Sequence, residues 1–201
     1  MSLLAKQGLG INVASVRRGF EVYRQICSKC HSLELFKLED LKQLGYSKKQ
    51  ILELANGKRV SRRFKLPYSS RTQAKAVNNG VVPPDLSLIT KYKGTNRIKN
   101  VFLGYTRINS LASPIGEASY YNNSFDGGIT LMPPVLLNGV VKYASRVPRT
   151  LIQYILDVTE FLLWVSEPWL NLRGRLILPA VGVFSTMCFL FLIILKQFKT
   201  S

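Results

Sequence analysis

Residues 26–31 read "ICSKCH", and this stretch decides how the rest of the chain is interpreted. Its last residue, His31, is the only histidine among 201 residues, and it directly follows Cys27 and Cys30. The spacing C-x-x-C-H is the attachment signature of c-type haem. Each thiol can add across one vinyl group of the porphyrin, and the adjacent imidazole can bind the iron. The motif therefore predicts one covalently attached haem c, with His31 as an iron ligand.

Two other kinds of site use closely spaced cysteines. A zinc site normally needs four ligands from two separated pairs, but the chain has no second histidine and its third cysteine, Cys188, lies in a long apolar run. A thioredoxin-like redox pair would need a βαβ context. The flanking sequence instead places Val16, Phe20 and Tyr23 at helical spacing, which favours haem attachment over both alternatives.

An electron-carrying haem needs a second protein ligand on the iron. With no second histidine available, methionine is the expected ligand, and it would raise the reduction potential. Of the three methionines, Met1 is the initiator and Met187 lies in the apolar run, so Met132 remains. It stands in "GGITLMPPVLL", where glycines allow close approach of the backbone and prolines stiffen the segment. If Met132 is instead an ordinary core residue, water or lysine would complete the coordination.

A membrane segment is predicted near the end of the chain. Residues 176–195 contain no charged side chain, and twenty residues form a helix of about 30 Å, which matches the hydrocarbon core of a bilayer. Basic residues flank this run on both sides, where they can reach lipid headgroups. Such a run is rarely a buried core helix. We therefore expect a haem domain over 1–172 and an anchor with a short tail over 173–201, with 176–195 as the spanning helix.

The positive charge of the chain is concentrated in one region. The chain has 28 basic and 11 acidic residues, a net charge of +17, and residues 54–84 contain no acid at all. Such a run forms a solvated face or meets an acidic partner or anionic lipid. No nucleic-acid-binding motif accompanies the charge, so a nucleic-acid partner is not expected.

The remaining pattern predicts a mainly α fold. We expect one helix from Arg24 into the early forties, a second over 47–57 with Ser47 as its N-cap, and irregular turns over 110–128. A further helix over 149–166 carries Gln153, Asp157 and Glu160 on one polar face. We expect it to pack against the haem domain, and a linker over 169–174 to lead into the anchor.

Several motifs together resemble one family. They are "RRGFEVYRQICSKCHS" from Arg17, "NNGVVPPDLSLI" from Asn78, the Met132 segment, "FLLWVSEP" from Phe161 and the apolar run near the C-terminus. In this order they resemble the cytochrome c1 family, whose members are the haem subunits of ubiquinol–cytochrome c reductase, the bc1 complex.

The resemblance implies a cytochrome c-like haem domain with a single C-terminal transmembrane helix. It implies that this domain lies in the mitochondrial intermembrane space and that the short tail lies in the matrix. As the haem c subunit of a multisubunit reductase, such a chain is an electron carrier that takes an electron from the Rieske iron-sulfur protein and passes it to soluble cytochrome c. Further implied partners are cytochrome b, other bc1 subunits including an acidic hinge-type subunit, and membrane lipid.

The resemblance also assigns roles to individual residues. It matches Cys27 and Cys30 to the thioether positions, and His31 and Met132 to the axial ligands. Asn79, Pro83 and Pro84 match a segment beside the haem. A basic side chain near the haem propionates is expected at Lys91 or Arg97.

Two departures from the family pattern affect these expectations. Many members carry an acidic insertion between the haem motif and the "NNG" segment, but this chain is short and basic there. Like charge would slow its encounter with a basic cytochrome c, so docking is expected to use Glu34, Glu39 and Asp40, an acidic subunit or a less basic cytochrome. The prolines after Met132 also shift the usual spacing by one residue. A c-type cytochrome of another respiratory complex and a ligand-binding haem sensor remain as alternatives.

Overall fold

The computed structural model of the chain describes residues 12–55, 67–105, 110–112, 118–144, 146–167 and 170–200. Residues 12–167 form one compact unit, which we call the head domain. The long C-terminal helix belongs to a separate unit and is described by itself.

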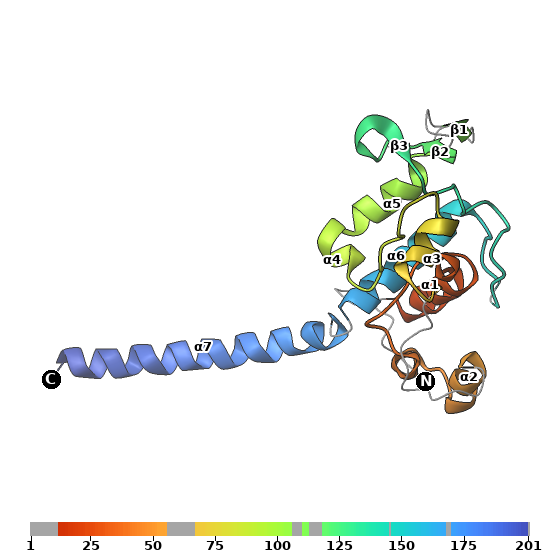
Figure 1. The fold of residues 1–201 in the computed structure, drawn as a ribbon. Helices are drawn as coiled ribbons and strands as arrows, with labels where there is room; N and C mark the ends of the chain where they lie inside the picture. Colours follow the sequence, from red (N-terminus) through yellow and green to blue (C-terminus); the bar gives the residue numbers. More distant parts are fainter. Residues whose placement is uncertain are drawn as a thin grey trace. The chain divides into compact units, whose positions relative to one another are not determined.

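Helices dominate the described part of the chain, as the sequence predicts (Figure 1). The α-helices of the head domain are α1 (Val13–Gln25), α2 (Lys48–Leu54), α3 (Arg71–Val77), α4 (Ile89–Lys93), α5 (Thr95–Leu103) and α6 (Leu151–Ser166). Three 3₁₀ helices cover Cys27–Lys29, Leu38–Leu44 and Asp126–Gly128. The strands β1 (Ser110–Ala112), β2 (Ala118–Tyr121) and β3 (Ile129–Thr130) form a small antiparallel sheet at the edge of the domain.

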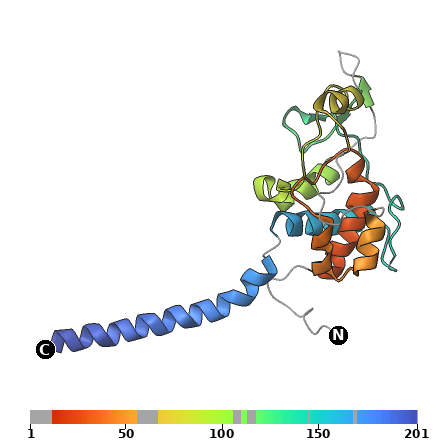
Figure 2. The same ribbon diagram turned by 60° about the horizontal axis from the view of Figure 1, so that its bottom comes forward.

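Helices α1 and α6 pack against each other at the centre of the head domain (Figures 1 and 2). Their backbones approach closely at Gly19. A Cβ atom added there would collide with the carbonyl oxygen of Asp157 and lie 2.6 Å from Cβ of Phe161. Only glycine fits this position without moving one helix away from the other.

Aromatic side chains fill the space around this helix pair. Phe161 of α6 lies with its ring centroid 5.6 Å from Phe20 of α1 and 5.8 Å from Phe36. Phe36 in turn contacts Trp164 edge to face at 5.9 Å. Tilted and edge-to-face pairs at these distances contribute about 0.5–1.5 kcal/mol each beyond the area they bury. The helix predicted over 149–166 therefore packs into the head domain, as expected.

A buried carboxylate ties α1 to α6. Asp157, which is 0% exposed, accepts hydrogen bonds from Nε and Nη2 of Arg18 at 2.8 and 2.7 Å and from the Ser15 hydroxyl at 2.6 Å. Tyr143 and Gln153 donate two more at 2.9 and 3.0 Å. Burial acts to raise the pKa of Asp157, but these hydrogen bonds outweigh it and hold the pKa below the usual value. The sequence placed Asp157 on the polar face of this helix with Gln153, and the structure shows that α1 supplies further partners that allow it to be buried.

Replacing this carboxylate should destabilise the head domain. We expect Asp157→Asn to lower the free energy of unfolding by about 3–5 kcal/mol, because it leaves the partly buried Arg18 guanidinium without its counter-charge. The lowered pKa gives the carboxylate a stabilising effect that is complete above the ordinary aspartate pKa of about 3.9 and is lost as pH falls through the folded value. Urea unfolding followed by circular dichroism from pH 7 down to about pH 2, which includes the range below the ordinary aspartate pKa where this loss occurs, would measure both effects.

The matched control is Glu160→Gln on the same helix, where the carboxylate is partly exposed. It should change stability by no more than about 0.5 kcal/mol. Equal losses for the two variants, or a pH dependence that Asp157→Asn leaves intact, would contradict the role given to Asp157.

The predicted helix from Arg24 into the early forties is wrong. Helix α1 ends at Gln25, the haem motif follows in the 3₁₀ turn Cys27–Lys29, and Leu38–Leu44 is a separate 3₁₀ helix. Between the two turns, the amides of Glu34 and Leu35 donate to side chains of residues 85 and 87 rather than within a helix. Distant partners therefore replace the local helical bonds.

Other boundaries differ less from the expectation. Ser47 caps α2 as predicted and accepts from the Gln50 amide at 3.2 Å, whereas the predicted helix end at Gly57 lies outside the described residues. Most of the basic run also lies outside them, but Arg71 and Lys75 are described on α3. The segment expected to be irregular over 110–128 instead contains β1 and β2, with Tyr120 opposite Ser110.

The C-terminal helix α7 covers Leu170–Thr200 and therefore begins inside the segment expected to be a linker. Its stretch Pro179–Gln197, 19 residues with a mean hydropathy of 2.0, is long and apolar enough to cross a membrane. The predicted span 176–195 overlaps most of it. The hydroxyl of Thr186 donates to the Gly182 carbonyl at 2.6 Å, so its polar group is satisfied within the helix.

Candidate haem site

The C-x-x-C-H motif occupies one tight turn that directly follows α1. The amides of Cys30 and His31 both donate to the carbonyl of Cys27, at 3.1 and 2.9 Å. Ser28 closes the preceding turn by donating its hydroxyl to the Arg24 carbonyl at 2.7 Å. Because α1 is fixed by α6, the turn presents the two cysteines and the histidine from a rigid base.

Both motif cysteines carry free thiols, and they differ in burial. Cys27 is buried, and this raises the pKa of its thiol to about 12, whereas Cys30 is partly exposed. Two free thiols at this spacing fit the covalent attachment of a porphyrin. Within the described part of the chain, no group of three His, Cys, Asp or Glu side chains is placed to hold a bare metal ion. Iron in a porphyrin needs fewer protein ligands than a bare metal ion, because the porphyrin supplies four nitrogen ligands itself.

The imidazole of His31 is held in one orientation. Its Nδ1 lies 2.8 Å from the carbonyl oxygen of Pro84, so Nδ1–H donates and Nε2 keeps its lone pair for a metal. Burial lowers the pKa of His31, which favours the neutral ring that coordination requires. Tyr23 of α1 donates to the His31 carbonyl at 3.0 Å. The structure therefore brings together two residues, His31 and Pro84, that the sequence assigned to the haem site.

Asp85 fastens the Pro84 segment to the residues that follow the motif. Its carboxylate accepts from the Ser32 hydroxyl at 2.7 Å and from the amides of Glu34 and Ser87, both at 2.8 Å. Burial acts to raise the pKa of Asp85, but these bonds together lower it. The Leu86 amide adds a backbone bond to the Ser32 carbonyl at 3.0 Å. We call these contacts the Asp85 brace, because they fix the carbonyl that orients His31.

The brace can be tested by Asp85→Asn. One carboxylate oxygen would become an amide group that cannot accept the bonds from Ser32 and Glu34, so we expect a loss of about 1–3 kcal/mol in unfolding free energy. We also expect a broadened or shifted Soret band in the haem-loaded protein, because the His31 ring becomes less fixed.

Glu53→Gln, which changes an exposed carboxylate on α2, is the control and should alter neither stability nor spectrum. An Asp85→Asn protein with an unchanged spectrum would show that the brace does not orient His31.

Met132 is presented from a separate part of the chain. Gly127 and Gly128 have φ angles of 76° and 71°, a backbone conformation that favours glycine in the turn before β3. The amide of Met132 then bonds Oγ1 of Thr130 at 3.2 Å, and the hydroxyl of Tyr105 donates to the Met132 carbonyl at 2.8 Å. The backbone of Met132 is thus held on both sides, and its side chain is partly exposed. Its role as an iron ligand stays a prediction.

The other predicted site residues have structural roles of their own. Asn79 has a φ of 49° and directly follows Asn78, the C-cap of α3, in a Schellman motif in which the Gly80 amide donates to the Lys75 carbonyl at 2.9 Å. Lys91 is exposed on α4, and Arg97 of α5 lies over the ring of Phe125, 5.1 Å from its centroid. Their placement beside the haem stays a prediction.

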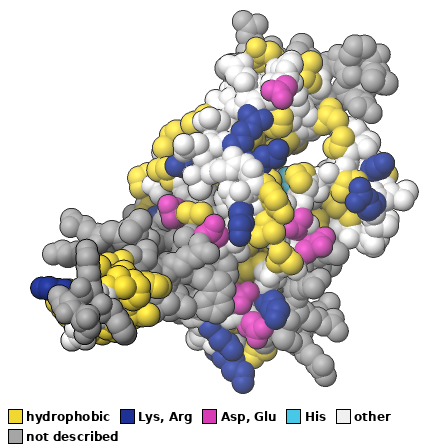
Figure 3. Space-filling view, turned by 90° about the vertical axis from the view of Figure 1, so that its left-hand side faces the viewer, with side chains coloured by type: hydrophobic (Ala, Val, Ile, Leu, Met, Phe, Trp, Pro, Cys, Tyr) yellow, Lys and Arg dark blue, Asp and Glu magenta, His cyan; other side chains and the backbone are white. Residues whose placement is uncertain are grey.

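The surface around the single histidine is hollowed. Figure 3 shows the histidine atoms beside an opening that is bordered by hydrophobic side chains, with Lys and Arg side chains on either side. An apolar hollow beside a neutral imidazole suits a porphyrin, whose ring is apolar and whose propionates are anionic. The sequence did not predict that Tyr23, Asp85 and Tyr105 support this site, although Asp85 follows the prolines of the quoted "NNGVVPPDLSLI".

Comparison with known proteins supports the same interpretation. The model of the family described as "Cytochrome C1 family" matches residues 9–201. The chain belongs to the cytochrome c1 family. It is 36% identical over 179 aligned residues to "Cytochrome c1-2, heme protein, mitochondrial" of Solanum tuberosum, covering 80% of this chain and 68% of that protein.

Two fungal members of the cytochrome c1 family are similar over a larger part of the chain. One is "Cytochrome c1, heme protein, mitochondrial" of Saccharomyces cerevisiae, 34% identical over 92% of this chain and 66% of that protein. The other is "Cytochrome b-c1 complex catalytic subunit, mitochondrial" of Candida albicans, 35% identical over 92% of this chain and 71% of that protein. The chain spans 58% of the length of one relative from Arabidopsis thaliana, so it is shorter than the plant proteins it matches.

Proposed function

We propose that the chain is the electron-transfer haem subunit of a mitochondrial bc1 complex, taking an electron from a Rieske iron-sulfur protein and passing it to soluble cytochrome c. The observation that carries this proposal is the geometry of the motif. A neutral imidazole, fixed through Nδ1 by Pro84, stands beside two free thiols in a chain of the cytochrome c1 family. When bound, haem supplies a one-electron redox centre.

Four residues would hold the haem. Cys27 and Cys30 would attach it through thioethers, and Nε2 of His31 and the sulfur of Met132 would bind its iron. These groups fit because both thiols are free, the His31 ring is neutral and oriented, and the Met132 backbone is fixed. Two protein ligands leave no position open for a gas molecule, which favours an electron carrier over a ligand-binding sensor.

The surrounding residues would set the conditions for electron transfer. The Pro84 carbonyl holds one tautomer of His31, and the Asp85 brace holds that carbonyl. Because Asp85 already accepts three hydrogen bonds from its own segment and its neighbours, little rearrangement is needed when the charge of the site changes. A rigid site of this kind suits rapid one-electron transfer. Asn79 and either Lys91 or Arg97 would complete the surroundings of the haem.

The membrane arrangement follows from the same proposal. Residues 1–172 would form the haem domain in the intermembrane space, and residues 173–201 would anchor it in the inner membrane with the short tail in the matrix. Partners would be cytochrome b, the Rieske protein, other bc1 subunits including an acidic hinge-type subunit, and lipid. The length and hydropathy of Pro179–Gln197 support the anchor.

Met132→Leu is the most direct test of electron-carrier function. Leucine keeps the side-chain volume but cannot bind iron, so the reduction potential should fall by roughly 100 mV or more, within the ≈ 0.8 V that axial ligands can span. A redox titration followed by visible absorption would measure the shift. The matched control is Met187→Leu in α7, which makes the same chemical change and should leave the potential unaltered.

An unchanged potential in Met132→Leu would contradict the axial role of Met132 and favour the sensor alternative. Attachment and assembly need separate measurements. A pyridine haemochrome spectrum should show haem c in the unaltered chain. Co-purification from detergent-solubilised membranes should recover a cytochrome b and a Rieske protein, whereas recovery of an oxidase would indicate another respiratory complex.

A further inference from the structure

The last turn of α6 carries a buried hydroxyl group, that of Ser166, which has no role in the haem site described above. This hydroxyl donates to the carbonyl of Ser87 at 3.0 Å, and the hydroxyl of Thr90 lies 2.7 Å from its oxygen. Ser87 and Thr90 are also buried. The three residues belong to α6, to α4 and to the segment just before α4, and we call their hydrogen bonds the Ser166 link.

The carbonyl acceptor fixes the direction of the hydrogen bonds in the Ser166 link. A backbone carbonyl can only accept, so Ser166 must donate its one hydroxyl proton to Ser87. The proton between Ser166 and Thr90 is therefore the proton of Thr90. Thr90 also lies 3.3 Å from the Leu162 carbonyl, which is the weaker contact because it is longer. Loss of the Ser166 hydroxyl would thus deprive the Ser87 carbonyl of a donor and Thr90 of its nearer acceptor.

Ser87 connects the Ser166 link to the Asp85 brace. The amide of Ser87 donates to the Asp85 carboxylate at 2.8 Å, and its hydroxyl accepts from the Leu35 amide at 3.1 Å. Its carbonyl accepts from Ser166. The amide, hydroxyl and carbonyl of this buried residue are therefore all hydrogen-bonded, and they join α6 to the segment that carries the Pro84 carbonyl.

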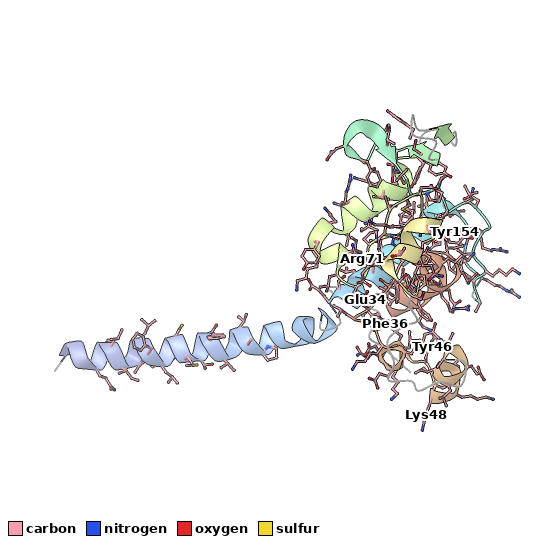
Figure 4. All side chains as sticks on the ribbon, viewed as in Figure 1. Glu34, Phe36, Tyr46, Lys48, Arg71 and Tyr154 are labelled. Carbon is pink, nitrogen blue, oxygen red and sulfur yellow. The ribbon has the colours of Figure 1, made fainter. Side chains whose placement is uncertain are left out.

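The Asp85 brace on its own joins two irregular segments to each other. Its bonds run between residues 32–34 and residues 85–87, neither of which is helical. The Ser166 link bonds this pair of segments to α6, which is itself fixed by α1. Phe36, labelled in Figure 4, packs against Trp164 in the same last turn of α6, with ring centroids 5.9 Å apart. The end of α6 therefore supports both segments.

We propose that Ser166, assisted by Thr90, is a positioning residue for His31. The Ser166 link would hold Ser87, and through it the Pro84 carbonyl that accepts from Nδ1 of His31. This inference rests on the proposed function, in which His31 binds the haem iron. A firm hydrogen bond from Nδ1–H makes an imidazole a more basic ligand, and a more basic ligand favours ferric over ferrous iron. The last turn of α6 would thus hold the reduction potential below the value that a loosely bonded His31 would give.

Ser166→Ala in the purified complex is the first test, because alanine removes the hydroxyl and keeps the Cβ atom. The bond from His31 to Pro84 should weaken and the potential should rise, so that the ratio of reduced to oxidised haem at a fixed ambient potential increases severalfold. A redox titration followed by visible absorption measures this ratio. Damage that detached Met132 would instead lower the potential, since methionine ligation raises it.

A second measurement of the same variant does not depend on the haem. The Leu35 amide bonds the Ser87 hydroxyl, and the Glu34 amide bonds Asp85. Hydrogen–deuterium exchange of a peptide covering residues 33–36 should become severalfold faster in Ser166→Ala, because local opening of this segment becomes easier. Exchange in a peptide covering residues 15–24 of α1 should stay the same.

Thr90 offers a pair of variants that separates the hydroxyl from side-chain shape. Thr90→Val keeps the branched shape and removes the hydroxyl, so the potential and the exchange rate should change in the same direction as in Ser166→Ala. The changes should be smaller, because Ser166 still donates to Ser87. Thr90→Ser keeps the hydroxyl and should behave like the unaltered chain.

Two matched controls lie on α6 itself. The buried hydroxyl of Thr159 has no hydrogen-bond partner among the described residues, so Thr159→Val should change neither the potential nor the exchange rate. Tyr154, labelled in Figure 4, lies in the first turn of α6, and its hydroxyl donates to the Val141 carbonyl at 3.1 Å. Tyr154→Phe should therefore lower stability without raising the potential or speeding exchange at residues 33–36.

Three outcomes would overturn the positioning role of Ser166. The first is an unchanged or lowered potential in Ser166→Ala, even if exchange at residues 33–36 becomes faster, since the link would then be only structural. The second is an equal rise of the potential in Tyr154→Phe. The third is a Thr90→Ser protein that behaves like Thr90→Val. Failure of the proposed function would appear in the unaltered complex, whose haem would lack the absorption and electron paramagnetic resonance spectra of histidine–methionine ligation.

Discussion

The contact between the Asp157 carboxylate and α1 is the interaction on which the rest of the head domain depends. Arg18 and Ser15 bond this carboxylate from α1, and Gly19 allows the two backbones to meet beside it. Leaving a buried charge unpaired is strongly destabilising, so these contacts favour the register in which the two helices pack. The packing of α1 against α6 also positions the haem motif, because Cys27 lies only two residues after the end of α1.

The site itself is assembled from segments that are distant in sequence. The Pro84 carbonyl meets His31 across 53 positions, and the Asp85 brace keeps the two segments together. Met132 is supported by Tyr105 and by the glycine turn before β3. The cysteines and the histidine are thus local to one turn, whereas the groups that would orient the iron from each side are brought in by folding.

Patterns among neighbouring residues predicted several helices and caps of the head domain. Features that depend on residues distant in sequence were not predicted. The 149–166 helix and the Ser47 cap were readable because periodicity and capping are properties of neighbouring residues. The absence of a continuous helix from Arg24 into the forties was not readable, because the amides of Glu34 and Leu35 bond side chains of residues 85 and 87. The burial of Asp157 was not predicted for the same reason: a polar residue on an apolar helix is buried only when another element supplies its donors. Strands of two to four residues are too short to show a period.

The site consists of one local turn and two segments that are remote in sequence, and this division determines what happens when one of the segments opens. If thioethers fix the haem at Cys27 and Cys30 and Met132 binds its iron as proposed, opening of the Met132 segment cannot release the haem, and the detached sulfur stays at a high effective concentration next to the iron. Re-ligation is then a unimolecular event that does not depend on protein concentration. A chain with its thioethers intact could therefore pass through partly unfolded states and recover, and damage at Met132 would leave a coloured protein that no longer carries electrons at its normal potential.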